Sequence, residues 1–269
     1  MKPVKSVTDR LDVCLWTKNS AKLLPRTLQR FEEVVPEEVV GKKILVDDHS
    51  SDNTTAIAKG HGWRVYENPK SGVASGANEA LRHVSTPFFI SIEHDVLLAN
   101  GWWPKIWRDI VTDPRVAVAQ GWRAPTNRTL RAILADNVDY SIDNNIYRTD
   151  IIRQVGGFPN TCVVCTDSWL KRNLEDAGYK WLVDARVVSE HVRSGVMQEA
   201  AHRSRLHRMC TCKRWSYPTS YVLRLTLMSP ASGLKLALKH DAPAAFFAYP
   251  YLRVQILQGW LSGEIARSS

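Results

Sequence analysis

The first half of the chain alternates short apolar runs with segments whose apolar residues recur at helical spacing. The apolar runs predict strands at 11–17, 42–48, 63–68, 87–95 and 115–121. The helical spacing predicts helices at 20–34, 53–59, 72–84 and 166–178, and 143–156 reads as an irregular connection into a helix. Such alternation is typical of β-α units that form a mostly parallel sheet flanked by helices. The sequence therefore predicts an α/β protein.

The last part of the chain, 201–269, has a different pattern. The segments SYVLRLTLM and GLKLALKH carry apolar stripes at helical spacing, with Arg224, Lys235 and Lys239 at their edges. This part holds ten Lys and Arg but only two acids, so it carries +8 of the formal net charge of +9. Basic helices of this kind, rich in aromatic residues, are typical of segments that lie in a membrane interface. The alternative is a helical cap that packs on the preceding domain and leaves its charges in water.

Length and composition narrow the class of protein. The 269 residues, 44% of them hydrophobic, can bury a substantial core, which excludes a disordered chain. No apolar run approaches the roughly 18 residues that cross a bilayer. The N-terminal segment MKPVKSVTDR also lacks the apolar stretch of a signal peptide. We therefore expect an intracellular chain.

The five cysteines leave alternatives open. The pairs Cys162-x-x-Cys165 and Cys210-x-Cys212 could bind zinc or form disulfides. Unligated thiols are favoured, because CxC is poor spacing for a zinc knuckle and no matching pair completes either motif.

Acidic residues stand where two of the predicted strands end. VDDHSSDNT occupies 46–54, and Glu93-His94-Asp95 ends the strand at 87–95. Ligands of open α/β sheets bind at the carboxyl ends of the strands. Residues i and i+2 of a strand point the same way, so Glu93 and Asp95 can face one site, and paired carboxylates suit Mg²⁺ or Mn²⁺ bound to a phosphate ligand. The alternative is a solvated loop, with the residues from Asp52 to Thr54 acting only as a helix cap.

Two common phosphate-binding designs are excluded. A dinucleotide site needs a glycine-rich turn after the first strand, but TKNSAK contains no glycine. A P-loop is excluded as well, since GxxxxGK[ST] does not occur in the chain.

The combination of motifs resembles family 2 of the glycosyltransferases, inverting enzymes with the GT-A fold that use nucleotide sugars. VDDHSSDNT is similar to the family's VDDxSxDxT signature. Further similarities follow in the family's order over roughly residues 8–195: Thr17-Lys18-Asn19 after the first strand, Gly72-x5-Asn78, Glu93-x-Asp95 for DxD, Thr166-Asp167 for the ED pair, Arg172, Gly178-Tyr179 and His191. The chain departs from the family where Glu93 replaces the first Asp, Ala77 replaces a frequent arginine, and Thr166 replaces the first acid of the ED pair.

The resemblance implies a GT-A, Rossmann-like domain at 1–200, with a nucleotide-sugar half at about 8–95 and an acceptor half at 96–200, followed by a basic amphipathic helical extension at 201–269. It assigns nucleotide-sugar binding to Thr17, Asn19, Asp47, Asp48, Gly72, Asn78 and Glu93. It assigns a divalent cation, Mn²⁺ or Mg²⁺, to Asp95 and His191, although a lone histidine can also be structural. Asp167 is expected to be the general base, ionised in the first turn of its helix.

The expected activity is metal-dependent transfer of a hexose, with inversion of configuration. Mannose from GDP-mannose and a lipid or lipid-linked acceptor are the first choices, with the enzyme peripheral at the inner face of the cell membrane through 201–269. The alternatives are a UDP-glucose type of donor with a soluble or protein glycan acceptor, and an inactive module that binds membrane or nucleic acid. No nucleic-acid partner is expected.

Overall fold

The structure, a computed structural model, describes residues 10–135, 140–160, 164–192, 195–209 and 218–268. The chain divides into two compact units. The first comprises 1–123, 139–160 and 166–191, and the second comprises 124–138, 161–165 and 192–269. The second unit thus also takes segments from within the first two hundred residues, and the predicted boundary at residue 200 stays a prediction.

The first unit is built on an eight-stranded mixed sheet with the strand order β3-β2-β1-β4-β7-β6-β8-β5. Its strands are β1 (Leu11–Thr17), β2 (Val40–Asp47), β3 (Arg64–Glu67), β4 (Phe88–Ser91), β5 (Val96–Leu97), β6 (Val116–Pro125), β7 (Asn145–Arg148) and β8 (Lys180–His191). Its helices are α1 (Leu24–Val34), the short η2 (Glu37–Val39), α2 (Thr54–Gly60), α3 (Val73–His83), α4 (Trp102–Thr112), α6 (Thr149–Gln154) and α7 (Thr166–Asp176).

The sheet is covered on both faces because its strands are apolar at successive positions. In β1, Val13 and Leu15 belong to a core that also contains buried side chains of α1, α2 and α4. The intervening Cys14 and Trp16 belong to a second core, with side chains of α3, α6 and α7. Successive residues of a strand point to opposite faces, so one continuous apolar run serves both helical layers. The predicted α/β architecture is therefore confirmed.

Strand directions bring several strand ends to one edge of the sheet. β1 pairs in parallel with β2 and β4, and β2 pairs in parallel with β3. β7 runs antiparallel to both β4 and β6, and β5 runs antiparallel to β8. The carboxyl ends of β1, β2 and β4 consequently share an edge with the beginning of β7.

Two details of the predicted elements are wrong. The segment 143–156 does lead into a helix, α6, as predicted, but the part before that helix is the strand β7 and not an irregular connection. The predicted strand at 87–95 ends at Ser91, and a turn through His94 leads into β5. The chain must turn there because β5 pairs with β8, at the far end of the strand order from β4. Glu93 and Asp95 thus lie outside the strand, and strand alternation does not bring them together.

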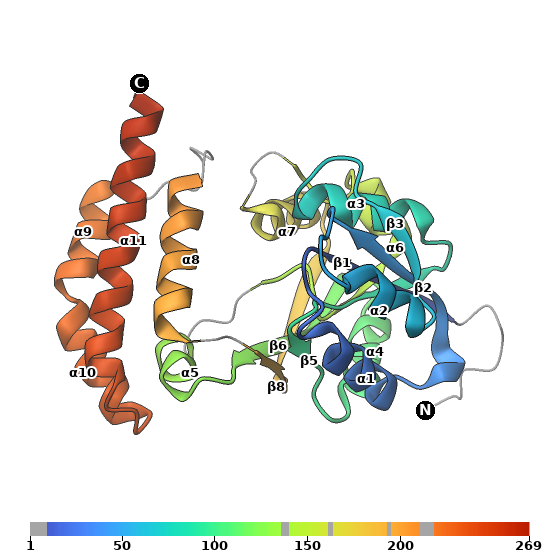
Figure 1. Cartoon of the computed structure of the whole chain (residues 1–269), viewed down its shortest axis with the longest axis horizontal. Coiled ribbons are helices and arrows are strands. Elements are labelled where there is room, and N and C mark those ends of the chain that lie inside the picture. Colours follow the sequence, from blue (N-terminus) through green and yellow to red (C-terminus); the bar gives the residue numbers. More distant parts are fainter. Residues whose placement is uncertain (1–9, 136–139, 161–163, 193–194, 210–217, 269) are drawn as a thin grey trace. The chain divides into compact units, whose positions relative to one another are not determined.

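The second unit consists of helices, as expected for the C-terminal part of the chain. They are α5 (Arg128–Leu134), α8 (Val196–Met209), α9 (Thr219–Leu227), α10 (Ser229–Lys239) and α11 (Ala245–Ser268). In Figure 1, α9 and α10 follow one another along one side of α11, with α8 along the other. Its core contains buried residues of α5 and of α8 to α11, such as Val222, Ala237 and Leu252. Among the described residues no helix has both the length and the apolar character needed to cross a membrane.

The cysteine motifs fall mostly outside the described residues, since Cys162, Cys210 and Cys212 are not among them. Cys14 is a free thiol buried within the sheet. Burial raises the pKa of this thiol, and the charge of Asp12 adds to the effect. Cys14 is therefore a packing residue with little thiolate character.

Candidate active site

The loops after β1 and β2 are held together by hydrogen bonds between their backbones and polar side chains. The Asp48 amide donates to the Thr17 carbonyl at 2.8 Å. The Asn19 amide donates to Ser50 Oγ, and the Ser51 amide donates to Asn19 Oδ1, each at 2.8 Å. Asn19 has a φ of 50°, a left-handed conformation that asparagine tolerates better than most residues. Thr17 and Asn19 therefore shape this edge, with the Asn19 side chain bonded to the second loop.

Asp47 is the buried acid of the VDDHSSDNT segment. Its side chain lies at the end of β2, and Oδ2 accepts a hydrogen bond from the Ser50 amide at 2.9 Å. The residue is only 8% exposed, and among the described residues no group donates a hydrogen bond to Oδ1. A buried carboxylate oxygen without a donor costs free energy unless a ligand supplies one. Asp47 can thus accept a hydrogen bond from a bound molecule.

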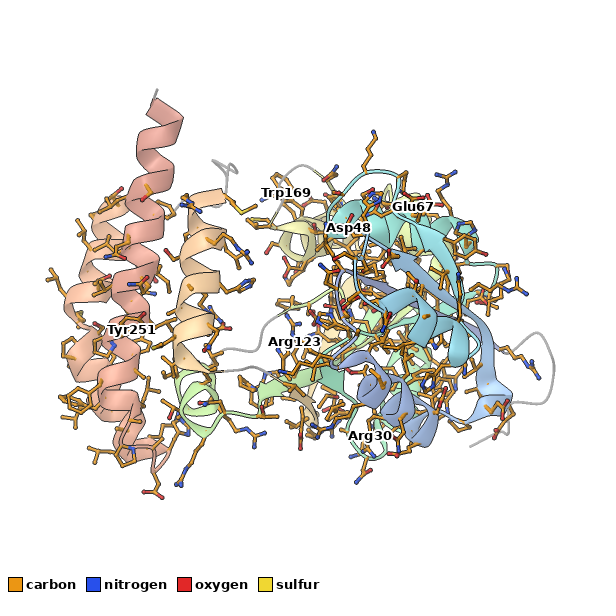
Figure 2. All side chains as sticks on the ribbon, in the orientation of Figure 1. Arg30, Asp48, Glu67, Arg123, Trp169 and Tyr251 are labelled. Carbon is orange, nitrogen blue, oxygen red and sulfur yellow. The ribbon has the colours of Figure 1, made fainter. Side chains whose placement is uncertain are left out.

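Asp48 is partly committed to the protein. Its Oδ1 accepts from Asn68 Nδ2 at 3.1 Å, and its Oδ2 accepts from the Gly72 amide at 3.4 Å. Figure 2 shows Asp48 near Glu67, the last residue of the neighbouring strand β3. Gly72 has a φ of 111°, a backbone conformation that favours glycine, and it precedes α3. Asp48 and Gly72 therefore meet at the start of α3, and their assignment to the nucleotide stays a prediction.

Asp52 acts on the turn between β2 and α2. Its Oδ1 accepts from the Thr54 amide and its Oδ2 accepts from the Ala21 amide, both at 3.0 Å. The hydrogen bond from the Thr54 hydroxyl lowers the pKa of Asp52, and the two amides lower it further. Asp52 thus binds the first amide of α2, whereas the N-cap residue Asn53 makes no side-chain capping bond. The turn therefore occupies Asp52 and leaves Asp47 and Asp48 available for another role.

Asn78 is hydrogen-bonded to the segment after α6 through both polar atoms of its side-chain amide. Its Nδ2 donates to the Phe158 carbonyl at 2.8 Å, and its Oδ1 accepts from the Phe158 amide at 2.8 Å. A Cβ on the neighbouring Gly157 would lie 2.5 Å from Asn78 Oδ1, so Gly157 makes room for the amide. Asn78 fastens the segment after α6 to α3, and its predicted contact with the nucleotide stays a prediction.

Glu93, Asp95 and His191 form one group of potential metal ligands. One side-chain donor atom from each lies within 4.8 Å of the others. Asp95 Oδ2 is 3.3 Å from His191 Nε2. The antiparallel register pairs His191 with Val96, which places the histidine beside the turn that carries the two acids. Two carboxylates and an imidazole suit Mn²⁺ or Mg²⁺, so the group fits the expected divalent cation.

Two residues that the sequence did not single out lie against Glu93. Arg123 Nη1 is 2.5 Å from Glu93 Oε2 and 3.7 Å from Asp143 Oδ2; Figure 2 labels Arg123. Burial raises the pKa of Asp143 well above its usual range, and the charge of Glu93 adds to the effect. β4 ends at Ser91 opposite Asn145, where β7 begins, so the turns that carry Glu93 and Asp143 leave the sheet from adjacent strand ends. Predicting this contact would have required a signal for the antiparallel strand β7.

Asp167 lies in the first turn of α7, as the sequence predicts. Its Oδ1 accepts a hydrogen bond from the Ser168 amide at 2.7 Å. Burial raises the pKa of Tyr147, and the negative charge of Asp143 and, to a smaller extent, that of Asp167 add to the effect. The N-terminus of the helix favours the ionised carboxylate, which is the form that a base needs.

The order of these motifs along the chain agrees with a comparison to known families. The model of the family described as Glycosyl transferase family 2 matches residues 12–178. This chain belongs to that family. The matched segment contains all of the predicted site residues except His191, which is supplied by the end of β8.

Solved structures of similar proteins confirm the GT-A fold of this family 2 glycosyltransferase. The mannosyltransferase PcManGT from Pyrobaculum calidifontis, in complex with GDP-Man and Mn²⁺, has a TM-score of 0.67 at 16% identity over 96% of this chain and 88% of that one. Glucosyl-3-phosphoglycerate synthase from Mycobacterium tuberculosis, in complex with Mn²⁺, UDP and glucosyl-3-phosphoglycerate, has a TM-score of 0.57 at 14% identity over 75% and 78%. S. aureus TarS 1-349 in complex with UDP has a TM-score of 0.55 at 14% identity over 96% and 91%. No curated protein sequence matches the chain.

The glycosyltransferase thus carries its polar residues in two groups. Asp47, Asp48 and Gly72 lie at the ends of β2 and the start of α3, and Glu93, Asp95 and His191 form the group of metal ligands. Glu93, which the sequence assigned to the nucleotide, is part of the second group and lies beside Arg123.

Proposed function

We propose that this glycosyltransferase moves a hexose from a nucleotide diphosphate sugar to a lipid or lipid-linked acceptor, with inversion at the anomeric carbon. Mannose from GDP-mannose is the donor that we favour. The observation that carries the proposal is the group formed by Glu93, Asp95 and His191 beyond the carboxyl end of β4. The complex of PcManGT with GDP-Man and Mn²⁺ supports the choice of donor and cation.

Asp95 and His191 would hold the cation, and Glu93 is near enough to contribute a carboxylate oxygen. Bound there, a divalent cation would neutralise charge on the diphosphate leaving group. The buried Oδ1 of Asp47 would accept a hydrogen bond from an N–H of the nucleobase or a hydroxyl of the ribose. Asp48, already bonded to Gly72, would add a second oxygen at the same edge.

Asp167 would act as the general base. It takes the proton from an acceptor hydroxyl while that oxygen forms a bond to the anomeric carbon. The bond between this carbon and the diphosphate oxygen breaks on the opposite side, and the bonding electrons leave with the diphosphate. A single displacement of this kind inverts the configuration of the sugar.

A second donor class has its own support. Glucosyl-3-phosphoglycerate synthase, with the same fold, was also determined with Mn²⁺, UDP-Glc and phosphoglyceric acid. A UDP-glucose donor with a soluble acceptor is therefore the alternative for this chain. The two donor classes differ in the nucleobase, guanine or uracil, that Asp47 would contact.

The test is calorimetric titration of the full chain with GDP-mannose, GDP-glucose, UDP-glucose and UDP-mannose, with and without Mn²⁺. We expect the tightest binding for GDP-mannose with Mn²⁺, and tightest binding of UDP-glucose would select the alternative. NMR of the product should show the inverted anomer, and a retained configuration would overturn the mechanism. The absence of both binding and donor hydrolysis would instead identify an inactive module.

The acceptor class rests on the composition of 201–269. This part of the chain is basic and rich in aromatic residues, so it would hold the enzyme at the inner face of the cell membrane, where lipid acceptors are found.

A further inference from the structure

Helices α9 and α10 expose large apolar side chains in the structure. Leu227 is 80% exposed and Leu238 is 76% exposed. Beyond α10, at the start of α11, Phe247 is 75% exposed. A single exposed leucine is ordinary, but apolar residues concentrated on neighbouring helices mark an interaction surface.

The exposed residues of α10 form one face of the helix. Leu234 and Leu238 are four residues apart and form one row, and Lys235 and Lys239 form the adjacent row. The opposite side carries Gly233 and Ala237, which are buried in the unit. The helix therefore presents leucines and lysines together to its surroundings.

Helix α9 repeats this arrangement. Val222 is its buried residue, and Leu223 and Leu227 are exposed with Arg224 between them. α9 and α10 follow one another along α11, and each exposes leucines together with basic residues. We call the exposed residues Leu227, Leu234, Leu238, Arg224, Lys235 and Lys239 of these two helices the α9–α10 face.

The α9–α10 face carries positive charge, since neither helix contains an acidic residue. The acidic side chains that the structure describes in this unit are Glu199 and Asp241. Glu199 Oε1 is 2.7 Å from Arg203 Nε, and Asp241 Oδ2 is 2.6 Å from Arg128 Nη2. Both of these acids are thus paired with arginines outside α9 and α10.

We propose that the α9–α10 face docks on a lipid bilayer with anionic headgroups. The leucines enter the boundary between headgroups and acyl chains, and the cations beside them lie at the level of the phosphates. A second copy of the chain fits the face poorly, because pairing two such faces would bring like charges together. Docking on the membrane would bring the enzyme to a lipid acceptor, so its purpose rests on the proposed function. The docking itself needs no catalysis.

The test is co-sedimentation of the full chain with phosphatidylcholine vesicles that contain or lack phosphatidylglycerol. We expect binding to the anionic vesicles, weaker binding to the neutral ones, and a loss of this preference as salt is raised. Each basic residue near an anionic surface contributes about 1 kcal/mol, so the double variant K235Q/K239Q should bind the anionic vesicles about thirtyfold more weakly. Lys105→Gln, at an exposed position of α4, is the matched control and should bind like the wild type.

The apolar contribution is tested with L234Q/L238Q, which should lose binding to both kinds of vesicle. Val111→Gln, which changes an exposed apolar residue of α4, is its control. Equal binding to neutral and anionic vesicles, or equal losses in variants and controls, would overturn the proposal. So would a dimer, seen by light scattering, that L234Q/L238Q dissociates.

Asp95→Ala separates this proposal from the proposed function. If both hold, the variant loses sugar transfer and keeps vesicle binding. Vesicle binding by a wild-type chain that neither hydrolyses nor transfers sugar would refute only the function. Sugar transfer by a chain that binds no vesicle would refute only the docking.

Discussion

Asp95 is the residue whose removal tests the cation site most directly. It lies 3.3 Å from His191 and shares the ligand group with Glu93. We expect Asp95→Ala to weaken Mn²⁺-dependent donor binding by more than about a hundredfold. Removing a residue that only hydrogen-bonds to a metal ligand already lowers metal affinity by about 10–100-fold, and Asp95 is expected to bind the metal directly. Titration calorimetry with and without Mn²⁺ measures the effect, and Asp113→Ala, in an exposed ion pair with Arg115, is the control. If donor binding by Asp95→Ala depended on Mn²⁺ as it does in the wild type, Asp95 would not be a ligand of the cation.

Asp167 is tested through the rate, because a general base contributes to transfer and not to donor binding. Asp167→Asn keeps the shape of the side chain and removes its basicity, so the turnover number should fall about 10²–10⁴-fold with donor affinity unchanged. Asp150 is a matched control, since it also follows a threonine in the first turn of a helix of this unit. Asp150→Asn should leave turnover intact, and equal losses in the two variants would count against the assignment.

Arg123 balances the charge of the ligand group in the absence of a cation. It lies 2.5 Å from Glu93 and 3.7 Å from Asp143. Arg123→Gln should lower the free energy of unfolding by about 2 kcal/mol. Breaking a fully buried ion pair costs about 3–5 kcal/mol, and the cost is smaller here because these side chains are partly exposed. Mn²⁺ should restore part of the loss, since it supplies positive charge beside Glu93. Denaturant unfolding with and without Mn²⁺ checks this, with Arg115→Gln as the exposed control.

The site could be predicted from the sequence where local motifs define it. Asp47 and Asp48 end a strand, and Asp167 begins a helix, and both features are local. Arg123 and Asp143 could not be predicted, because the antiparallel pairing of β7 with β4, which brings the segments of Asp143 and Glu93 to adjacent strand ends, has no local signal. The hydrogen bonds of Asn78 to Phe158 join residues far apart in the chain and were likewise beyond the sequence.

At the scale of elements, the contact between α8 and α11 depends on two glycines. A Cβ on Gly259 would collide with the carbonyl of Ser204, and one on Gly263 would lie 2.9 Å from the carbonyl of Arg208. The two helices approach closely because these positions have no side chain. Gly259→Ala should destabilise the helical unit by about 3 kcal/mol, the upper range for overpacking.

Thermal unfolding followed by circular dichroism measures the effect of Gly259→Ala. Ser262→Ala changes an exposed position of the same helix and should be neutral, because alanine favours helix. Equal stability of Gly259→Ala and wild type would show that α8 and α11 can separate at no cost.

Helices and strands with a local sequence pattern could be predicted, and strands that only pairing with distant strands defines could not. The predicted strand at 11–17 coincides with β1, because its apolar run is bounded by polar residues on both sides. β7 and β5 are only a few residues long, and their pairing with distant strands defines them, so periodicity could not find them. The predicted helix at 20–34 begins later, at Leu24, with Pro25 in its first turn, where proline is tolerated.

At the scale of the whole molecule, the two units have separate cores. The sheet of the first unit supports the cores on its two faces, and the core of the second unit is formed by α5 and α8 to α11. We therefore expect the full chain to unfold in two calorimetric transitions. A ligand that binds only the first unit should raise the midpoint temperature of only one of the two unfolding transitions.

GDP-mannose with Mn²⁺ at a hundred times the dissociation constant adds about 2.7 kcal/mol to the unit that binds it. For a unit of this size each kcal/mol moves the midpoint by about 2–4 °C, so that transition should rise by roughly 5–10 °C. Asp95→Ala should abolish this shift without moving the other transition, whereas Gly259→Ala should lower the other transition and leave the shift intact. A single transition that both variants move would mean that the two units unfold as one cooperative body, and the ligand would then stabilise the helices as well as the sheet.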